Sequence, residues 1–131
     1  MSVKSKGINA ERELIHLFWQ NGWVAVRVAG SGSSQYPSPD VLASNAERKL
    51  AIEAKLTKDP KKYFAKEEVE QLRLFSEKFG AEPWIAVKFK RDSWYFLKLE
   101  DLEQTSNNFV ISNQMAKNKG LSFKNLIENS F

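Results

Sequence analysis

Asp40, Glu53 and Lys55 are the residues of this chain whose types and spacing could support chemistry together. In the run Leu50–Lys55, the alternation of a β-strand places the aliphatic residues on one face and Glu53 with Lys55 on the other. A short turn separates this run from Val41–Ala43, which predicts a hairpin. Such a hairpin would bring Asp40, at the start of the first strand, close to Glu53.

Two carboxylates beside a lysine are typical of a site where a divalent cation acts on a phosphate ester. Mg²⁺ binds through one or two carboxylates and keeps water and phosphate oxygens as its other ligands. The ion provides a nucleophilic water and neutralises charge on the phosphate. A nearby ammonium group could orient that water or stabilise the developing charge. The simpler interpretation is a solvated Glu–Lys pair on a half-exposed strand, and Glu53 with Lys55 alone would favour it.

Glu11 is a third acidic candidate, because it falls within the apolar stripe of a predicted helix. The helix runs from Ile8 to about Asn21 and ends at the Asn-Gly pair that follows. At about 100° per residue, the flanking positions of this stripe are Ile8, Leu14, Ile15 and Phe18. A carboxylate there must be paired, protonated or bound to a cation. The alternative is a glutamate of the first turn, favoured by the helix dipole.

The remaining periodicities predict an α/β sandwich around a mixed sheet, in one domain spanning residues 1–131. A Gly-, Ser- and Pro-rich loop covers residues 30–39. A β-rich run, 23–29, precedes it, and further along the chain we expect a helix over 65–79 and strands over 84–89 and 94–99. The catalytic core is expected over about 7–100. Residues 103–131 form an extension with a possible strand at 109–112 and helix near 122–129, and no function is assigned to it.

Composition narrows the classes of protein that remain. The 131 residues are 42% hydrophobic and 12% aromatic, which is enough for a packed core. No cysteine is present, so disulfides and thiolate metal sites are excluded, and His16 alone cannot form a zinc site. No apolar run resembles a membrane span or signal core, so we expect an intracellular protein. The net charge is +4, and residues 1–66 carry 11 basic and 6 acidic residues against 9 and 10 in residues 67–131, which points to a polyanion partner for the first half.

Several motifs together resemble a known family of nucleases. Pro39-Asp40, twelve intervening residues and Glu53-Ala54-Lys55 resemble the PD-(D/E)xK signature. The stretch Gly7–Glu13 is similar to the Gly-x-x-x-Glu-Arg opening of archaeal-type Holliday junction resolvases, the Hjc family. Further segments follow in family order: Gly22–Ser33, Glu68–Leu72, Phe75, Phe79-Gly80 and Ala86–Lys88. The resemblance covers about residues 6–100.

This resemblance implies a restriction-endonuclease-like fold, with a central mixed β-sheet flanked by helices. It implies a homodimer that resolves four-way DNA junctions by paired symmetric nicks. The implied catalytic residues are Glu11, Ser31, Asp40, Glu53 and Lys55. Of these, Glu11, Asp40 and Glu53 would hold Mg²⁺, for which Mn²⁺ would substitute, and Lys55 would act at the scissile phosphate. No small-molecule cofactor or membrane partner is implied, and archaeal and viral sources both fit the pattern.

Basic residues of the first half are the expected DNA contacts. The resemblance assigns Arg12 and Arg27 to DNA contact or catalysis. The other expected contacts are Lys4, Lys6, Ser33, Lys58, Lys61, Lys62 and Lys66. In the lysine-rich segment Tyr63 and Phe64 interleave with the cations, and an ordinary solvated loop is the alternative interpretation.

The helix over 65–79 has two apolar sides, which allows contact with both the sheet and a partner subunit. Leu72, Phe75 and Phe79 share a side with Val69, and Leu74 lies nearly opposite. From the resemblance, we assign the dimer interface to Leu72, Phe75 and Phe79. The aromatic residues of the later strands are expected in the core or an interface rather than stacked on bases, namely Trp84, Trp94, Tyr95 and Phe96.

Two other functions remain compatible with these residues. One is a PD-(D/E)xK nuclease that acts on linear duplex or on flaps. The other is a non-catalytic module that binds structured DNA. A chain of 131 residues leaves little room for base-reading elements, which favours recognition of DNA shape by a symmetric dimer. A pure binding module would gain nothing from acidic residues that face a phosphate.

Overall fold

A computed structural model describes residues 3–30 and 35–129, and the side chains of residues 3–5 lie outside this description. Along the chain the main sheet and its helices are formed by α1 (Val3–Gln20), β1 (Val24–Arg27), β2 (Val41–Ser44), β3 (Lys49–Thr57), α2 (Lys66–Phe79), β5 (Glu82–Phe89) and β6 (Trp94–Leu97). The other elements are β4 (Lys61–Ala65), η2 (Leu99–Asp101), β7 (Glu103–Gln104), β8 (Asn108–Ser112), α3 (Asn113–Lys119) and α4 (Phe123–Glu128).

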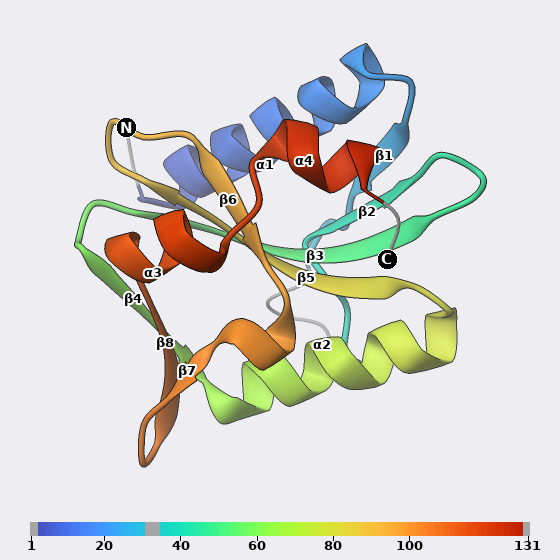
Figure 1. Cartoon of the computed structure of the whole chain (residues 1–131). Helices are drawn as coiled ribbons and strands as arrows, with labels where there is room; N and C mark the ends of the chain where they lie inside the picture. Colours follow the sequence, from blue (N-terminus) through green and yellow to red (C-terminus); the bar gives the residue numbers. More distant parts are fainter. Residues whose placement is uncertain (1–2, 31–34, 130–131) are drawn as a thin grey trace.

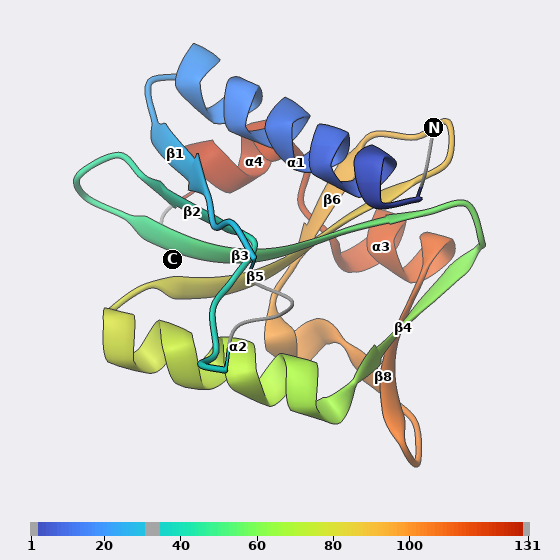
Figure 2. The same cartoon turned by 180° about the vertical axis from the view of Figure 1, so that it is seen from behind.

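The central sheet has five strands in the order β1-β2-β3-β5-β6. Only β3 and β5 pair in parallel; the other neighbours are antiparallel. The chain returns from β3 to β5 through β4 and α2, because a parallel pair requires a long crossover. Helices α1 and α4 cover one face of the sheet and α2 covers the other (Figures 1 and 2). The predicted mixed α/β architecture is therefore confirmed.

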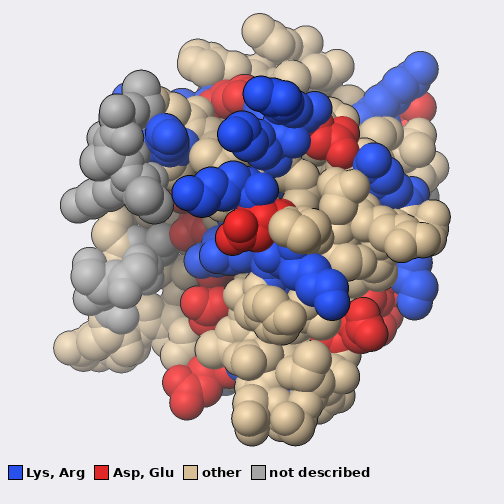
Figure 3. Space-filling model, turned by 90° about the vertical axis from the view of Figure 1, so that its left-hand side faces the viewer, with Lys and Arg blue, Asp and Glu red and all other residues tan. Residues whose placement is uncertain are grey.

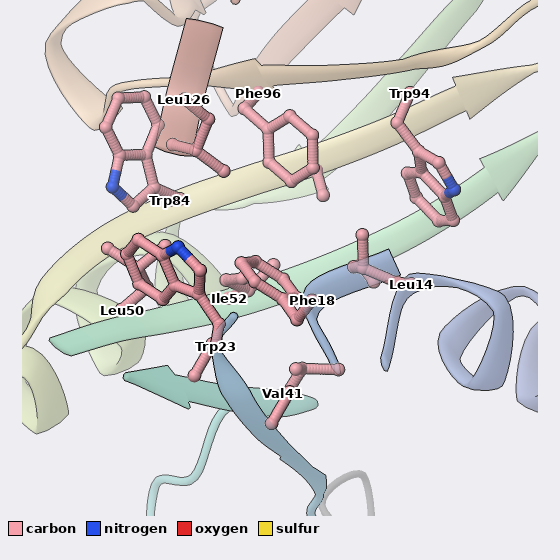
Figure 4. Close-up of a cluster of buried hydrophobic side chains, with 14 of the residues drawn as sticks. Leu14, Phe18, Trp23, Val41, Leu50, Ile52, Trp84, Trp94, Phe96 and Leu126 are labelled. Carbon is pink, nitrogen blue, oxygen red and sulfur yellow. The ribbon is translucent and has the colours of Figure 1, made fainter. Parts of the chain in front are cut away.

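Two apolar clusters hold the layers together, one on each face of the sheet. The first joins α1 and α4 to the sheet, and its largest side chains point toward one another (Figure 4), among them Phe18, Trp23, Trp84, Phe96 and Leu126. The second packs α2 against the opposite face of β3 and β5. In β3 the predicted alternation is present, since Leu50, Ile52 and Ala54 belong to the first cluster. The other face of β3 thus carries Glu53 and Lys55.

The structure corrects three expectations about element boundaries. Helix α1 begins at Val3 rather than Ile8, so it includes the basic residues before the apolar stripe. The lysine-rich segment contains strand β4, whose Phe64 is buried and which pairs with β8. Helix α3 was not predicted; the Ser112 hydroxyl accepts the Met115 N–H at its start. Both missed elements are short, and β4 depends on a partner strand more than forty residues away.

Arg48 fastens the end of the chain to the sheet. Its guanidinium forms a two-pronged ion pair with Glu82, at 2.9 Å for both Nε and Nη2. The Nη1 group donates to the carbonyl oxygens of Leu126 and Asn129, at 2.6 and 2.7 Å. The guanidinium carbon, Cζ, also lies over the Trp23 ring, 5.5 Å from the ring centroid. The extension beyond residue 103 is therefore packed against the sheet.

No helix within the described ranges is long and apolar enough to cross a membrane.

We expect Arg48→Ala to lower the free energy of unfolding by about 2–3 kcal/mol, because charge-assisted hydrogen bonds and two helix-end carbonyls lose their donor. Arg48→Lys should recover little, since an ammonium group cannot form the planar fork. Urea denaturation monitored by tryptophan fluorescence measures both. Lys49→Ala, at the exposed neighbouring position, is the matched control and should change stability by less than about 0.5 kcal/mol. Equal effects of Arg48→Ala and Lys49→Ala would contradict the anchoring function.

Candidate active site

Asp40 lies immediately before β2, at the open end of the β2–β3 hairpin. Its N–H donates to the Ile52 carbonyl at 3.0 Å, and its own carbonyl accepts the Val28 N–H at 2.8 Å. Its carboxylate Oδ2 accepts the Ala54 N–H at 2.9 Å. Since Val41 pairs with Ile52 in the antiparallel register, Asp40 lies across from Glu53. The hairpin predicted from the sequence is thus present, and it brings the two acids together.

Glu53 lies in an environment that disfavours its charge. Burial is the largest cause that raises its pKa to about 9, and the hydrogen bond and negative charge of Asp40 raise it further. Lys55 opposes this effect, and the carboxylate of Glu68 adds to it. Two carboxyl groups that share a hydrogen bond must share a proton or a cation. The pair is therefore a place where positive charge is stabilised.

The two acids and Lys55 line a cleft of about 330 Å³ between the sheet, the loop before β2 and helix α2. From α2 the lining side chains are Glu68, Gln71 and Leu72, and from the loop the cleft is lined by residues 35–39. The Ser38 hydroxyl in this loop is buried and has no hydrogen-bond partner among the residues that the structure describes. Glu68, Gln71 and Ser38 were not among the predicted site residues. The spacing of Glu68 and Gln71 beside the buried Leu72 is the signal that could have found the first two.

Glu11 points from α1 toward the protein body, as the helical wheel predicts. Its side chain is only 17% exposed, and its Oε1 accepts a hydrogen bond from Arg27 Nε at 3.0 Å. Burial raises the pKa of Glu11, as does the charge of Asp40, whereas Arg27 and Lys55 lower it. Among the alternatives of pairing, protonation or cation binding, the structure therefore shows pairing. Arg27, expected at DNA, forms this pair instead of pointing freely into solvent.

A three-residue metal site is not preformed. Within residues 3–30 and 35–129, no three Asp, Glu or His side chains form a group that could hold an ion. Asp40 and Glu53 form a hydrogen-bonded pair of carboxyl groups in the cleft, and one oxygen of Glu11 accepts the hydrogen bond from Arg27. Mg²⁺ suits such a site, since it commonly takes one or two carboxylates and keeps several waters. That Glu11 would join this ligand set, as the family resemblance implies, stays a prediction.

The other predicted site residues are placed as follows. Ser31 and Ser33, and the side chain of Lys4, lie outside the described part of the chain. The exposed basic residues are Lys6, Arg12, Lys58 and Lys61. Lys62 is half-buried, and Lys66 donates to the Ser106 carbonyl at 3.2 Å, so this lysine fastens the β7–β8 turn. Trp84, Trp94 and Phe96 are buried and Tyr95 is half-buried, which confirms their predicted packing in the core.

A mixed α/β sheet that carries Asp40 on one strand and Glu53-x-Lys55 on its neighbour has the arrangement of a PD-(D/E)xK nuclease. The family model described as archaeal Holliday junction resolvase (hjc) matches residues 2–131. The chain belongs to this family, which confirms the resemblance seen in its motifs.

Individual relatives agree with this membership. The crossover junction endodeoxyribonuclease Hjc of Archaeoglobus fulgidus is 46% identical over 109 residues, which cover 83% of this chain and 80% of the relative. The Hjc of Sulfolobus acidocaldarius is 32% identical over 130 residues, which cover 97% and 90%. The solved structure of A. fulgidus Hjc, a Holliday junction resolvase from an archaeal hyperthermophile, has a TM-score of 0.86 and 40% identity, and covers 92% of this chain and 97% of that one.

The raised pKa of Glu53 predicts a pH-dependent stability. Between its unfolded value of 4.5 and its folded value of about 9, the folded protein holds a proton that the unfolded chain has lost. The free energy of unfolding contributed by this group is therefore full below pH 4.5 and falls as pH rises toward 9. We expect Glu53→Gln to remove this loss and to be more stable than the native chain at pH 8, by about 1–3 kcal/mol.

Urea unfolding in EDTA at pH 5, 6.5 and 8 measures this effect. The two proteins should be similar at pH 5 and diverge as pH rises. Glu77→Gln, on an exposed position of α2, is the matched control and should follow the native chain at every pH. Parallel pH profiles of the Glu53→Gln and native proteins would refute the prediction.

Proposed function

We propose that this chain is a crossover junction endodeoxyribonuclease that resolves four-way DNA junctions by metal-dependent hydrolysis of phosphodiesters. The observation that carries this proposal is the pair of carboxyl groups, Asp40 and Glu53, beside Lys55 in one cleft of a Hjc-family chain. The neighbouring relatives named above are crossover junction endodeoxyribonucleases. A symmetric four-way junction offers two equivalent strands, which would be nicked as a pair.

Asp40 and Glu53 would hold the metal ion, Mg²⁺ or Mn²⁺, in place of the proton that the two carboxyl groups otherwise share. When bound, the ion supplies a more acidic water and neutralises charge on the phosphate. Lys55 lines the same cleft, where its ammonium group would contact the scissile phosphate and stabilise the charge that develops there. Glu11, which pairs with Arg27, would assist in positioning the metal ion or the water.

Asp40→Asn and Glu53→Gln should each lower the rate of junction cleavage by at least about 10³-fold, which corresponds to roughly 4 kcal/mol of barrier. Junction binding should persist, because the variants remove negative charge from a site that faces phosphate. Asp59→Asn, on an exposed aspartate of the β3–β4 turn, is the matched control and should cleave normally.

The assay compares an immobile four-way junction with linear duplexes of the same sequences, in Mg²⁺ and in EDTA. Paired symmetric nicks in the junction alone, and only with metal, are the expected result. Cleavage of the linear duplex would assign the nuclease to a different substrate. Tight junction binding without cleavage would identify a non-catalytic binding module. Normal cleavage by either acidic variant would refute the metal-site assignment.

We further propose that the chain acts as a homodimer through the α2 side of the sheet. On β1, Val24 and Val26 are 51% and 52% exposed, and Phe79 on α2 is 50% exposed. Ala25 faces the α1 cluster, so the two valines face the side of the sheet that α2 covers elsewhere. Exposed apolar side chains gathered on one side of a sheet are typical of interaction sites. Leu72 is 4% exposed within its own core, so it offers a partner little surface.

Phe79→Glu should convert the dimer into a monomer, because a charge would be buried without a partner. Phe75 stacks on Phe79 with ring centroids 5.1 Å apart, so the substitution also disrupts its neighbour's contact. Sedimentation equilibrium should give twice the chain mass for the native protein and the single mass for the variant. Tyr63→Glu, at a similarly exposed aromatic position, is the control and should remain dimeric. A native monomer, or a dimeric Phe79→Glu variant, would contradict this interface.

A further inference from the structure

The turn between β5 and β6 presents two adjacent basic side chains, Lys90 and Arg91, both exposed. Arg91 adopts a left-handed backbone conformation with φ of 62°, which is uncommon for a residue other than glycine. The turn is also tied to the end of β3, because the Lys90 N–H donates to the Thr57 carbonyl at 2.9 Å. An uncommon conformation persists where the surroundings fix it, and such positions are frequent in functional sites.

Asp92 provides the contacts that fix this turn. Its carboxylate accepts the Ser93 N–H at 2.8 Å and the Tyr95 hydroxyl at 3.1 Å. On helix α3, Asn113 Nδ2 donates to it at 3.4 Å, and Lys117 Nζ lies 3.9 Å away. The Ser93 N–H above all lowers the pKa of Asp92, with smaller effects from Asn113, Tyr95 and Lys117. The ionised carboxylate therefore connects the basic turn to its own strand and to α3.

Other cations surround this turn. Exposed lysines lie where β3 ends, where β4 begins and on α3, and these are Lys58, Lys61, Lys117 and Lys119. The β3 and β5 ends that carry the turn belong to the face shown in Figure 3, where blue basic side chains cover more of the surface than red acidic ones. Lys88, by contrast, is neutralised by Glu13 at 2.8 Å. The face thus carries a surplus of positive charge that suits a polyanion.

We propose that Lys90 and Arg91 bind backbone phosphates of the duplex arm that leads away from the cleft, and that Asp92 is a positioning residue that holds them there. This inference rests on the proposed junction-cleaving function. The turn lies beside the end of β3, near Thr57 and Lys58. Lys58 is three residues along the chain from Lys55 of the cleft, which places the turn about 10 Å along the strands from the cleft. With one phosphate per 3.4 Å of axis on each strand, the contacted phosphates lie about three nucleotides from the cut. The guanidinium of Arg91 suits a phosphate because it can donate two parallel hydrogen bonds.

The first test is the salt dependence of junction binding by the full-length protein, measured in EDTA so that no strand is cut. Lys90→Ala/Arg91→Ala should raise the dissociation constant about tenfold near 0.1 M salt and lower the slope of log K against log salt by about two. Lys49→Ala/Lys124→Ala removes the same charge from exposed positions on other elements, one of them the opposite end of β3, and should leave the slope as it is.

Variants of Asp92 distinguish a positioning function of this residue from a purely electrostatic effect of its charge. If only charge mattered, Asp92→Ala would tighten junction binding, because it removes a negative group from a basic face. A positioning function predicts weaker binding and a smaller salt slope for Asp92→Ala. Asp92→Asn, which keeps one oxygen acceptor for the Ser93 and Tyr95 donors, should restore much of the loss. Tighter binding by Asp92→Ala would overturn the positioning function.

A native salt slope in the Lys90→Ala/Arg91→Ala variant would overturn the phosphate contacts while leaving the junction-cleaving function intact. Failure of the native protein to bind or cleave junctions would instead refute the function on which the inference rests. Methylphosphonate substitution in the junction locates the contacted phosphates. Neutralising the phosphates about three nucleotides from the cut should weaken junction binding by the native protein and leave binding by the Lys90→Ala/Arg91→Ala variant unchanged. Equal weakening of both proteins would place the contact elsewhere and overturn the proposal.

Discussion

The antiparallel pairing of β2 with β3 is the constraint on which the site depends. It places Asp40 across from Glu53, and the Ala54 N–H holds the Asp40 carboxylate in that position. Because Glu53 is buried and hydrogen-bonded to Asp40, the two carboxyl groups oppose folding unless they share positive charge. The apolar cluster under α1 supplies the packing that holds the strands in register despite this cost. A site that weakens its own scaffold is a common consequence of selection for activity.

The cleft and the surface around it differ in the sign of their charge, so they would interact differently with DNA. Three acids, Asp40, Glu53 and Glu68, line the cleft against the single cation Lys55, so the cleft alone repels phosphate. The surplus of positive charge lies outside it, on the ends of β3 and β5 and on α3. On the proposed function, this outer surface attracts and orients the duplex arm by long-range attraction. Chemistry then requires a cation that neutralises the acids of the cleft.

Features governed by local periodicity could be predicted, whereas those governed by distant pairing could not. The alternation of β3 and the inward direction of Glu11 follow from residue spacing, and both are present. Strand β4 escaped prediction because Phe64 alone is fully buried there and β8 supplies its partner. The Glu11–Arg27 pair joins residues sixteen positions apart on different elements. The turn at Arg91 follows from the two strands predicted on either side of it. Its basic charge was overlooked, because the net charge of residues 67–131 is near zero and averages over opposite charges.

In the proposed site, a metal ion would replace the proton that the two carboxyl groups share. That ion would in turn take a phosphate oxygen of the substrate as a ligand, so metal binding and substrate binding would be linked. Asp40 and Glu53 lie together in the cleft, and an Mg²⁺ ion held by two carboxylates retains positions for water and phosphate oxygens. On the proposed assignment, a phosphate of the junction would therefore complete the site that cleaves it. If the β5–β6 turn holds a duplex arm as proposed, it would fix which phosphate reaches the cleft, since β3 and β5 connect the turn to the cleft. In the proposed homodimer, selectivity for a branched substrate would then arise from the requirement that both clefts receive their phosphates in this way.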